Sequence, residues 1–132
     1  ELRVVSTHLG LRHAERRRQV ERLLAHFDAE PSPFLIVLGD FNDWLPGAPA
    51  VRRLEERFGV SPRVASYPAW KPFLALDRIW VHPGSALREV SVRDTRLARR
   101  ASDHLPVVAR VTCPEAVDDP AGTHEKMAAG RR

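Results

Sequence analysis

Five consecutive apolar residues, Phe-Leu-Ile-Val-Leu at positions 34–38, stand between Pro33 and Gly39. A run of this length without alternating polar residues is typical of a strand that is buried on both faces of a sheet. The β-branched segment at 2–8 predicts a second strand. Between the two, apolar residues at helical spacing predict an amphipathic helix over 11–29. The order strand, helix, strand predicts a right-handed crossover.

The rest of the chain is expected to add shorter elements. We predict a helix at 50–58, closed by Gly59, and strands at 76–81, 87–94 and 105–112 that are close enough for antiparallel pairing. The loop at 61–75 contains Tyr67, Trp70 and Phe73, which we interpret as loop core in preference to a base-stacking platform. Residues 114–132 are rich in Asp, Pro, Gly and Ala and are expected to be disordered. The predicted fold class is mixed α/β, of the α+β kind.

Composition excludes several classes of protein. With 43% hydrophobic residues in 132 positions, the chain can form one domain with a modest core, which excludes disorder as its dominant state. Cys113 is the only cysteine, which excludes an internal disulfide framework and a cysteine-only zinc site. A lone cysteine favours a reducing compartment such as the cytoplasm, although the compartment stays open. No run approaches the ~20 apolar residues that a membrane span needs.

The charge is basic, with a formal net charge of +4. All but two of the 21 basic residues are arginines, the exceptions being Lys71 and Lys126. Arginine grips phosphate with a planar fork of donors, so nucleic acid, nucleotides and phospholipid headgroups are all compatible partners. An arginine excess also follows from genome composition, and both interpretations stay open at this point.

Polar side chains gather where the predicted apolar strands begin or end, which is where functional sites are usually assembled. The four groups are His8, Asp40 with Asn42, Asp77, and Asp103 with His104. Taken singly, each group also has a structural interpretation: an interior histidine bonded to backbone, a Gly-Asp turn, or a capped turn beside a surface histidine.

Two of these groups suit acid–base work on a phosphate. In an extended segment Asp40 and Asn42 point the same way, so the carboxylate can activate water while the amide donates to a phosphate oxygen. Asp77 could hold the His104 ring in one tautomer, as a carboxylate often does for a working histidine. These residue types do not by themselves choose phosphorus chemistry over other hydrolysis.

Together the four groups resemble the C-terminal motifs of the magnesium-dependent endonuclease/exonuclease/phosphatase superfamily. The matching segments, in order, are Ser-Thr-His-Leu at 6–9, Gly-Asp-Phe-Asn at 39–42, Leu-Asp-Arg-Ile at 76–79 and Ser-Asp-His-Leu-Pro-Val at 102–107. The resemblance implies half of a four-layer αββα sandwich, with a mixed sheet and helices on one face. It also implies a hydrolase that cleaves phosphodiester or phosphomonoester bonds with an activated water and Mg²⁺ or Mn²⁺.

The resemblance also implies a role for each group. Asp40 would align or activate the attacking water while Asn42 contacts the phosphate. His104, oriented by Asp77, would stabilise the phosphoryl group or transfer a proton. His8 would contact the phosphate or the leaving group. The metal would be held in part by Asp103, and three arginines of a short loop would meet the substrate's phosphate: Arg96, Arg99 and Arg100.

The chain departs from the family pattern in length. The family fold is about twice as long, and its first half supplies an Asn and a Glu that is the principal metal ligand. We therefore expect residues 1–113 to be the C-terminal half of such a domain, with the missing N-terminal half as its partner. The alternative is a catalytically incomplete module that binds polyanions or pairs with another chain through its uncovered sheet.

Overall fold

The computed structural model describes residues 1–45 and 47–113, so the tail predicted at 114–132 lies outside the described residues. The elements in chain order are β1 (Arg3–His8), α1 (His13–Ala29), β2 (Leu35–Asp40), α2 (Pro49–Phe58), β3 (Asp77–His82), a 3₁₀ turn η1 (Gly84–Ala86), β4 (Leu87–Val92), α3 (Arg96–Ala101) and β5 (Val107–Val111). The mixed α/β fold class is confirmed.

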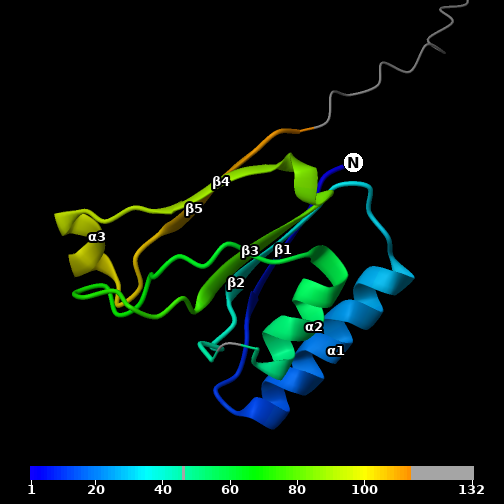
Figure 1. Ribbon diagram of the computed structural model, residues 1–132, viewed down its shortest axis with the longest axis horizontal. Coiled ribbons are helices and arrows are strands. Elements are labelled where there is room, and N and C mark those ends of the chain that lie inside the picture. The colour runs from blue at the N-terminus through cyan, green and yellow to red at the C-terminus, as the bar shows by residue number, and fades with distance from the viewer. Residues whose placement is uncertain (46, 114–132) are drawn as a thin grey trace, which may run out of the picture.

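Three strands form the central sheet in the order β1-β2-β3 (Figure 1). The apolar run lies in β2, the middle strand, as its sequence predicts. The helix α1 connects β1 to β2, and these two strands are parallel. A longer loop and α2 separate β2 from β3, which runs antiparallel to β2. The sheet is therefore mixed.

Close contact between β1 and β2 depends on Gly39. This residue has a φ of 145°, a conformation that side-chain-bearing residues rarely adopt. A Cβ atom at this position would overlap the carbonyl oxygen of Thr7 on the neighbouring strand. Glycine thus permits the pairing that continues to the strand ends at His8 and Asp40.

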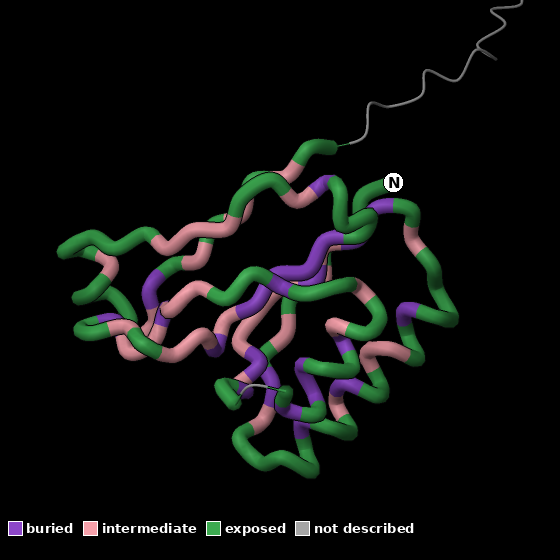
Figure 2. Tube along the Cα trace, in the orientation of Figure 1, coloured by how far each residue is buried: buried purple, intermediate pink, exposed green. Residues whose placement is uncertain are grey.

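Both long helices cover one face of the central sheet (Figure 1). Val20 and Phe27 of α1 and Leu54 of α2 are buried against Val37 of the middle strand. Phe41 and Trp80 join this core as an edge-to-face pair with ring centroids 4.9 Å apart. In Figure 2 the buried residues follow the strands and the inner sides of the helices.

The strands β4 and β5, which are connected through α3, form a separate antiparallel sheet on the side of the central sheet opposite the helices (Figure 1). We call this pair of strands the hairpin. Phe34, Ile79 and Val81 form a second apolar cluster with Ala86, and partly buried residues such as Val107 pack against it. The molecule thus has three layers: helices, central sheet and hairpin. No helix among the described residues is both long and apolar enough to cross a membrane.

Two expectations about the loops were wrong. The segment with Arg96, Arg99 and Arg100 is the helix α3, because Oγ1 of Thr95 accepts a hydrogen bond from the backbone N–H of Ala98 and caps the first turn. Trp70 and Phe73 are 71% and 67% exposed, so they are not loop core. Elsewhere the predicted ends of helices and strands differ from the observed ones by one or two residues.

Candidate active site

Strand register brings three of the predicted site residues side by side. His8 is the register partner of Asp40 in the parallel pair, and Asp40 is the partner of Asp77 in the antiparallel pair. Residues that are directly opposite on neighbouring strands project from the same face of a sheet. This face is the one opposite α1 and α2. The sheet therefore presents one row of side chains, in which the His8 imidazole is followed by the carboxylates of Asp40 and Asp77.

The carboxylate of Asp40 lies at the centre of the row. Its Oδ1 accepts a hydrogen bond of 2.8 Å from the backbone N–H of Asn42. Its Oδ2 lies 3.5 Å from Nε2 of His8 and 3.7 Å from Nε2 of His104. Both distances exceed a normal hydrogen bond, so neither ring forms a direct hydrogen bond with Oδ2, which leaves this oxygen's lone pairs available to a ligand in the cleft.

His104 is held from its other side by Asp77. The ring Nδ1 lies 2.8 Å from Oδ2 of Asp77, and because an ionised carboxylate can only accept, Nδ1 carries the proton. Ser66 donates a second hydrogen bond to the same oxygen. Partial burial lowers the pKa of His104, but the hydrogen bond and charge of Asp77, with the charges of Asp40 and Asp103, outweigh burial and raise this pKa above 6.5.

Asn42 has a structural role as well as a place at the site. It adopts a left-handed backbone conformation with φ 50°, and its side-chain Nδ2 donates to the carbonyl of Leu9 at 2.7 Å. This bond ties the chain after β1 to the end of β2. An amide nitrogen has two hydrogens, so one remains for a ligand.

Asp103 is exposed and projects from the turn before β5. Its carbonyl accepts from the backbone N–H of Ala69 at 2.6 Å, which fixes the turn against the loop at 61–75. No three metal-binding side chains cluster within residues 1–45 and 47–113. Magnesium commonly takes only one or two carboxylates and keeps several waters, so the carboxylates of Asp40 and Asp103 suit it chemically.

These side chains share one open cleft with a volume of about 610 Å³. His8, Asp40, Asn42, Asp103 and His104 all line it. The further lining residues are Leu11, His13, Arg16, Trp44, Leu45, Tyr67, Leu74 and Leu76. Asp77 lies behind His104 and acts on the cleft through that ring.

The three arginines of α3 do not line this cleft. Arg99 is already engaged, because its Nε and Nη2 bind the two carboxylate oxygens of Asp94 at 2.6 and 2.7 Å. Its remaining Nη1 donates to the carbonyl of Trp70. Arg99 therefore joins α3 to the loop at 61–75, and a substrate contact for Arg96, Arg99 or Arg100 stays a prediction.

Sequence reasoning missed three residues around the cleft. Ser66 supports Asp77, and the ring of Tyr67 lies against that of His104 with centroids 4.8 Å apart. Arg16 is 4% exposed and lines the cleft from α1. A serine or tyrosine in a loop has no periodic signal, whereas an arginine on the apolar stripe of a helix could have been noticed.

Comparison with known proteins found a matching family and similar sequences. The profile described as "Endonuclease/Exonuclease/phosphatase family" matches residues 3–104, which include the first three motifs and the Ser-Asp-His that begins the fourth. The uncharacterized protein YbhP of Escherichia coli K12 is 34% identical over 120 residues, which cover 83% of this chain and 46% of YbhP. YbhP of Shigella flexneri matches with the same values.

One solved structure supports the fold alone. A functionally unknown conserved protein from Enterococcus faecalis V583 superposes with a TM-score of 0.67 at 19% identity, covering 83% of this chain and 49% of that chain. The present chain thus spans about half the length of the relatives it matches.

Proposed function

The chain belongs to the endonuclease/exonuclease/phosphatase family, and from this premise we propose that it forms the acid–base half of a metal-dependent phosphoesterase. The bond cleaved is a phosphodiester or phosphomonoester. The observation that supports this most is the convergence of His8 and His104 on Oδ2 of Asp40, with Asp77 behind His104.

Each side chain then has one task in hydrolysis. Asp40 accepts a proton from water as the water oxygen bonds to phosphorus and the ester P–O bond breaks. His104 acts in its doubly protonated form, which the raised pKa favours: Asp77 accepts from Nδ1, and Nε2 donates to a phosphoryl oxygen on which charge increases. His8, whose side chain is 74% exposed, meets the leaving group and supplies its proton. The free hydrogen of the Asn42 amide donates to the phosphate.

A magnesium or manganese ion would be held by Asp103, with Asp40 as a second carboxylate in the same cleft. Such an ion neutralises charge on the phosphate oxygens. The chain covers less than half of YbhP, so we propose that the remaining length of the intact protein supplies the other metal ligand. The same segment would cover the face of the central sheet on which Val4 is 54% exposed.

The direct test is turnover of bis(p-nitrophenyl) phosphate and of DNA by the intact protein, with magnesium and with a chelator. We expect hydrolysis that requires the metal. Absence of turnover for these and for small phosphomonoesters would contradict the proposal.

The exposed side of β1 also favours a second candidate, a module that pairs with another chain without catalysis. This candidate predicts self-association or salt-sensitive retention on DNA with no hydrolysis. A monodisperse monomer that binds no polyanion would exclude it.

A further inference from the structure

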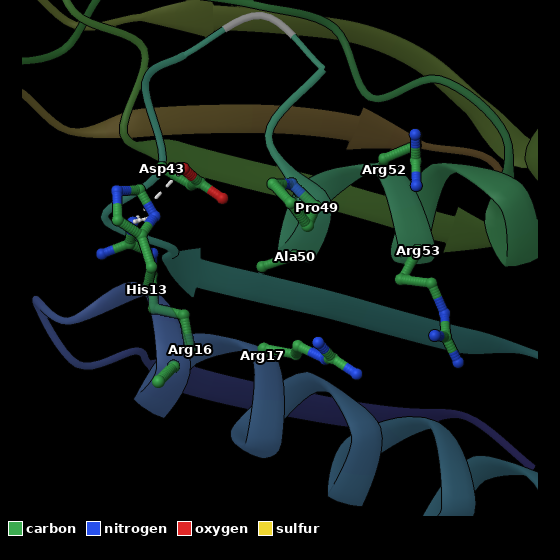
Figure 3. Close-up of a pocket in the computed structure, with 9 residues that line it drawn as sticks. His13, Arg16, Arg17, Asp43, Pro49, Ala50, Arg52 and Arg53 are labelled. Carbon is green, nitrogen blue, oxygen red and sulfur yellow. Dashed lines mark hydrogen bonds and ion pairs between the residues drawn. The ribbon is translucent and has the colours of Figure 1, made fainter.

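A second cavity, of about 550 Å³, lies between the first turns of α1 and α2 (Figure 3). We call it the basic pocket, because its lining includes four arginines and one carboxylate: Arg16, Arg17, Arg52, Arg53 and Asp43. His13 and Arg16 line both the basic pocket and the open cleft of the candidate active site, which we call the catalytic cleft. The two spaces therefore share a wall, at the edge of the sheet where β1 and β2 end.

Two positive charges face the gap between the helices. Figure 3 shows Arg17 reaching from α1 and Arg53 from α2 toward the same space, whereas Arg52 points away from α1. Arg53 makes no ion pair with a carboxylate in residues 1–45 and 47–113. Arg17 pairs with Glu21 on the same helix, at 3.1 Å, where its side chain is 72% exposed. Exposed pairs of this kind are weak and leave Arg17 available to a ligand.

Arg16 and Asp43, at the floor of the basic pocket, each have a polar atom without a hydrogen-bond partner among the described residues. Arg16 and Asp43 form a buried pair with 3.5 Å between Nη2 and Oδ1, and they are only 4% and 2% exposed. Among the described residues, Nε of Arg16 and Oδ2 of Asp43 have no hydrogen-bond partner. Buried polar atoms are rarely left unpaired, so a donor and an acceptor at the floor point to an absent ligand. The positive charge of Arg16 offsets the negative charge of Asp43, so this carboxylate does not exclude an anion from the pocket.

We propose that the basic pocket binds a second phosphate group, one that the substrate carries in addition to the ester attacked in the catalytic cleft. Arg17 and Arg53 grip its oxygens, and Arg16 donates from the floor. This inference rests on the proposed function and defines the substrate class as esters with at least two phosphate groups. A substrate hydroxyl beside that phosphate would satisfy Oδ2 of Asp43.

The test measures binding of inorganic tripolyphosphate by titration calorimetry in chelator, on the intact protein. The variant is Arg17→Gln with Arg53→Gln, which removes both positive charges, keeps polar side chains and leaves the catalytic residues unchanged. The matched control is Arg110→Gln, an arginine on β5 that pairs with Glu89 far from either cavity. We expect the double variant to weaken binding at least about tenfold and the control to have little effect.

A parallel assay separates this inference from the proposed function. Turnover of bis(p-nitrophenyl) phosphate, which has a single phosphate, should be unchanged in the double variant. Tripolyphosphate that fails to bind, or that binds the double variant and the control equally, overturns the basic pocket even if hydrolysis is normal. Loss of binding in the double variant upholds the pocket even if no ester is hydrolysed, in which case only the proposed function fails.

Discussion

Oδ2 of Asp77 lies 2.8 Å from Nδ1 of His104, although the two residues are 27 positions apart in the sequence. Asp77 begins a strand of the central sheet, while His104 precedes a strand of the hairpin layer. The contact therefore joins two layers and sets which nitrogen of His104 faces the cleft.

His104→Ala should reduce hydrolysis of bis(p-nitrophenyl) phosphate by about 10²-fold or more, because it removes the donor to the phosphate. Asp77→Asn should reduce it less, since the ring remains but its tautomer is no longer imposed. The matched control is His26→Ala, at a half-exposed position on α1, which should leave turnover unchanged. Equal rates for His104→Ala and the control would refute the assigned role.

Asp77→Asn should lower the pKa of His104, which the carboxylate raises above 6.5 in the wild-type protein. The measurement is a titration of the His104 ring protons by NMR in chelator, with the variant compared directly to wild type. If both proteins titrate at the same pH, the hydrogen bond with Asp77 does not exist in solution.

The same shift links stability to pH. Because the folded-state pKa of His104 lies above its unfolded value, the stabilisation is fully present below about pH 6.5 and disappears as the pH rises through the folded pKa. The free energy of unfolding of wild type relative to His104→Gln should therefore be larger at about pH 5.5 than at about pH 8.5. An equal difference at both pH values would contradict the linkage.

Gly39→Ala should lower the free energy of unfolding by about 2 kcal/mol or more, because alanine is strained at this φ and its Cβ meets the carbonyl of Thr7. Turnover should fall as well, since the strand pairing that aligns His8 with Asp40 is disturbed. The control is Gly84→Ala, where an added Cβ has open space. Chemical denaturation of both variants checks the difference.

Arg78→Met should raise the free energy of unfolding by about 1 kcal/mol or more. Arg78 is 1% exposed, and its Nε and Nη1 have no partner among the described residues. Burial, together with the nearby charge of Arg63, lowers the pKa of Arg78, so its charge is held at a cost. Arg88→Met on β4, where arginine is exposed, should change stability little. A large loss in Arg78→Met would show that this guanidinium has a partner in solution.

Local patterns predicted most of the fold. The apolar run became the central strand, and the helical spacing before it became α1, because both signals depend on residues close together in the chain. The cap at Thr95 was an equally local signal, and a search of the sequence for N-cap residues would have predicted α3. The exposure of Trp70 and Phe73 was different, since only the position of their loop decides whether anything covers them.

The candidate site likewise contains some residues that the sequence predicted and others that only the structure revealed. Strand ends and motif order were enough to name His8, Asp40, Asn42, Asp77, Asp103 and His104, which the structure brings to one region. Neither the support of Ser66 for Asp77 nor the position of Arg16 at the wall of two cavities follows from spacing.

Residue order and periodicity along the chain therefore settled which elements form and which side chains stand at their ends. Tertiary structure decided that His8, Asp40 and Asp77 occupy one row, that the hairpin layer places His104 against that row, and that two helices face arginines into a shared gap. The physical reason is that strand register and layer packing depend on contacts between residues far apart in sequence, and no local preference encodes these contacts.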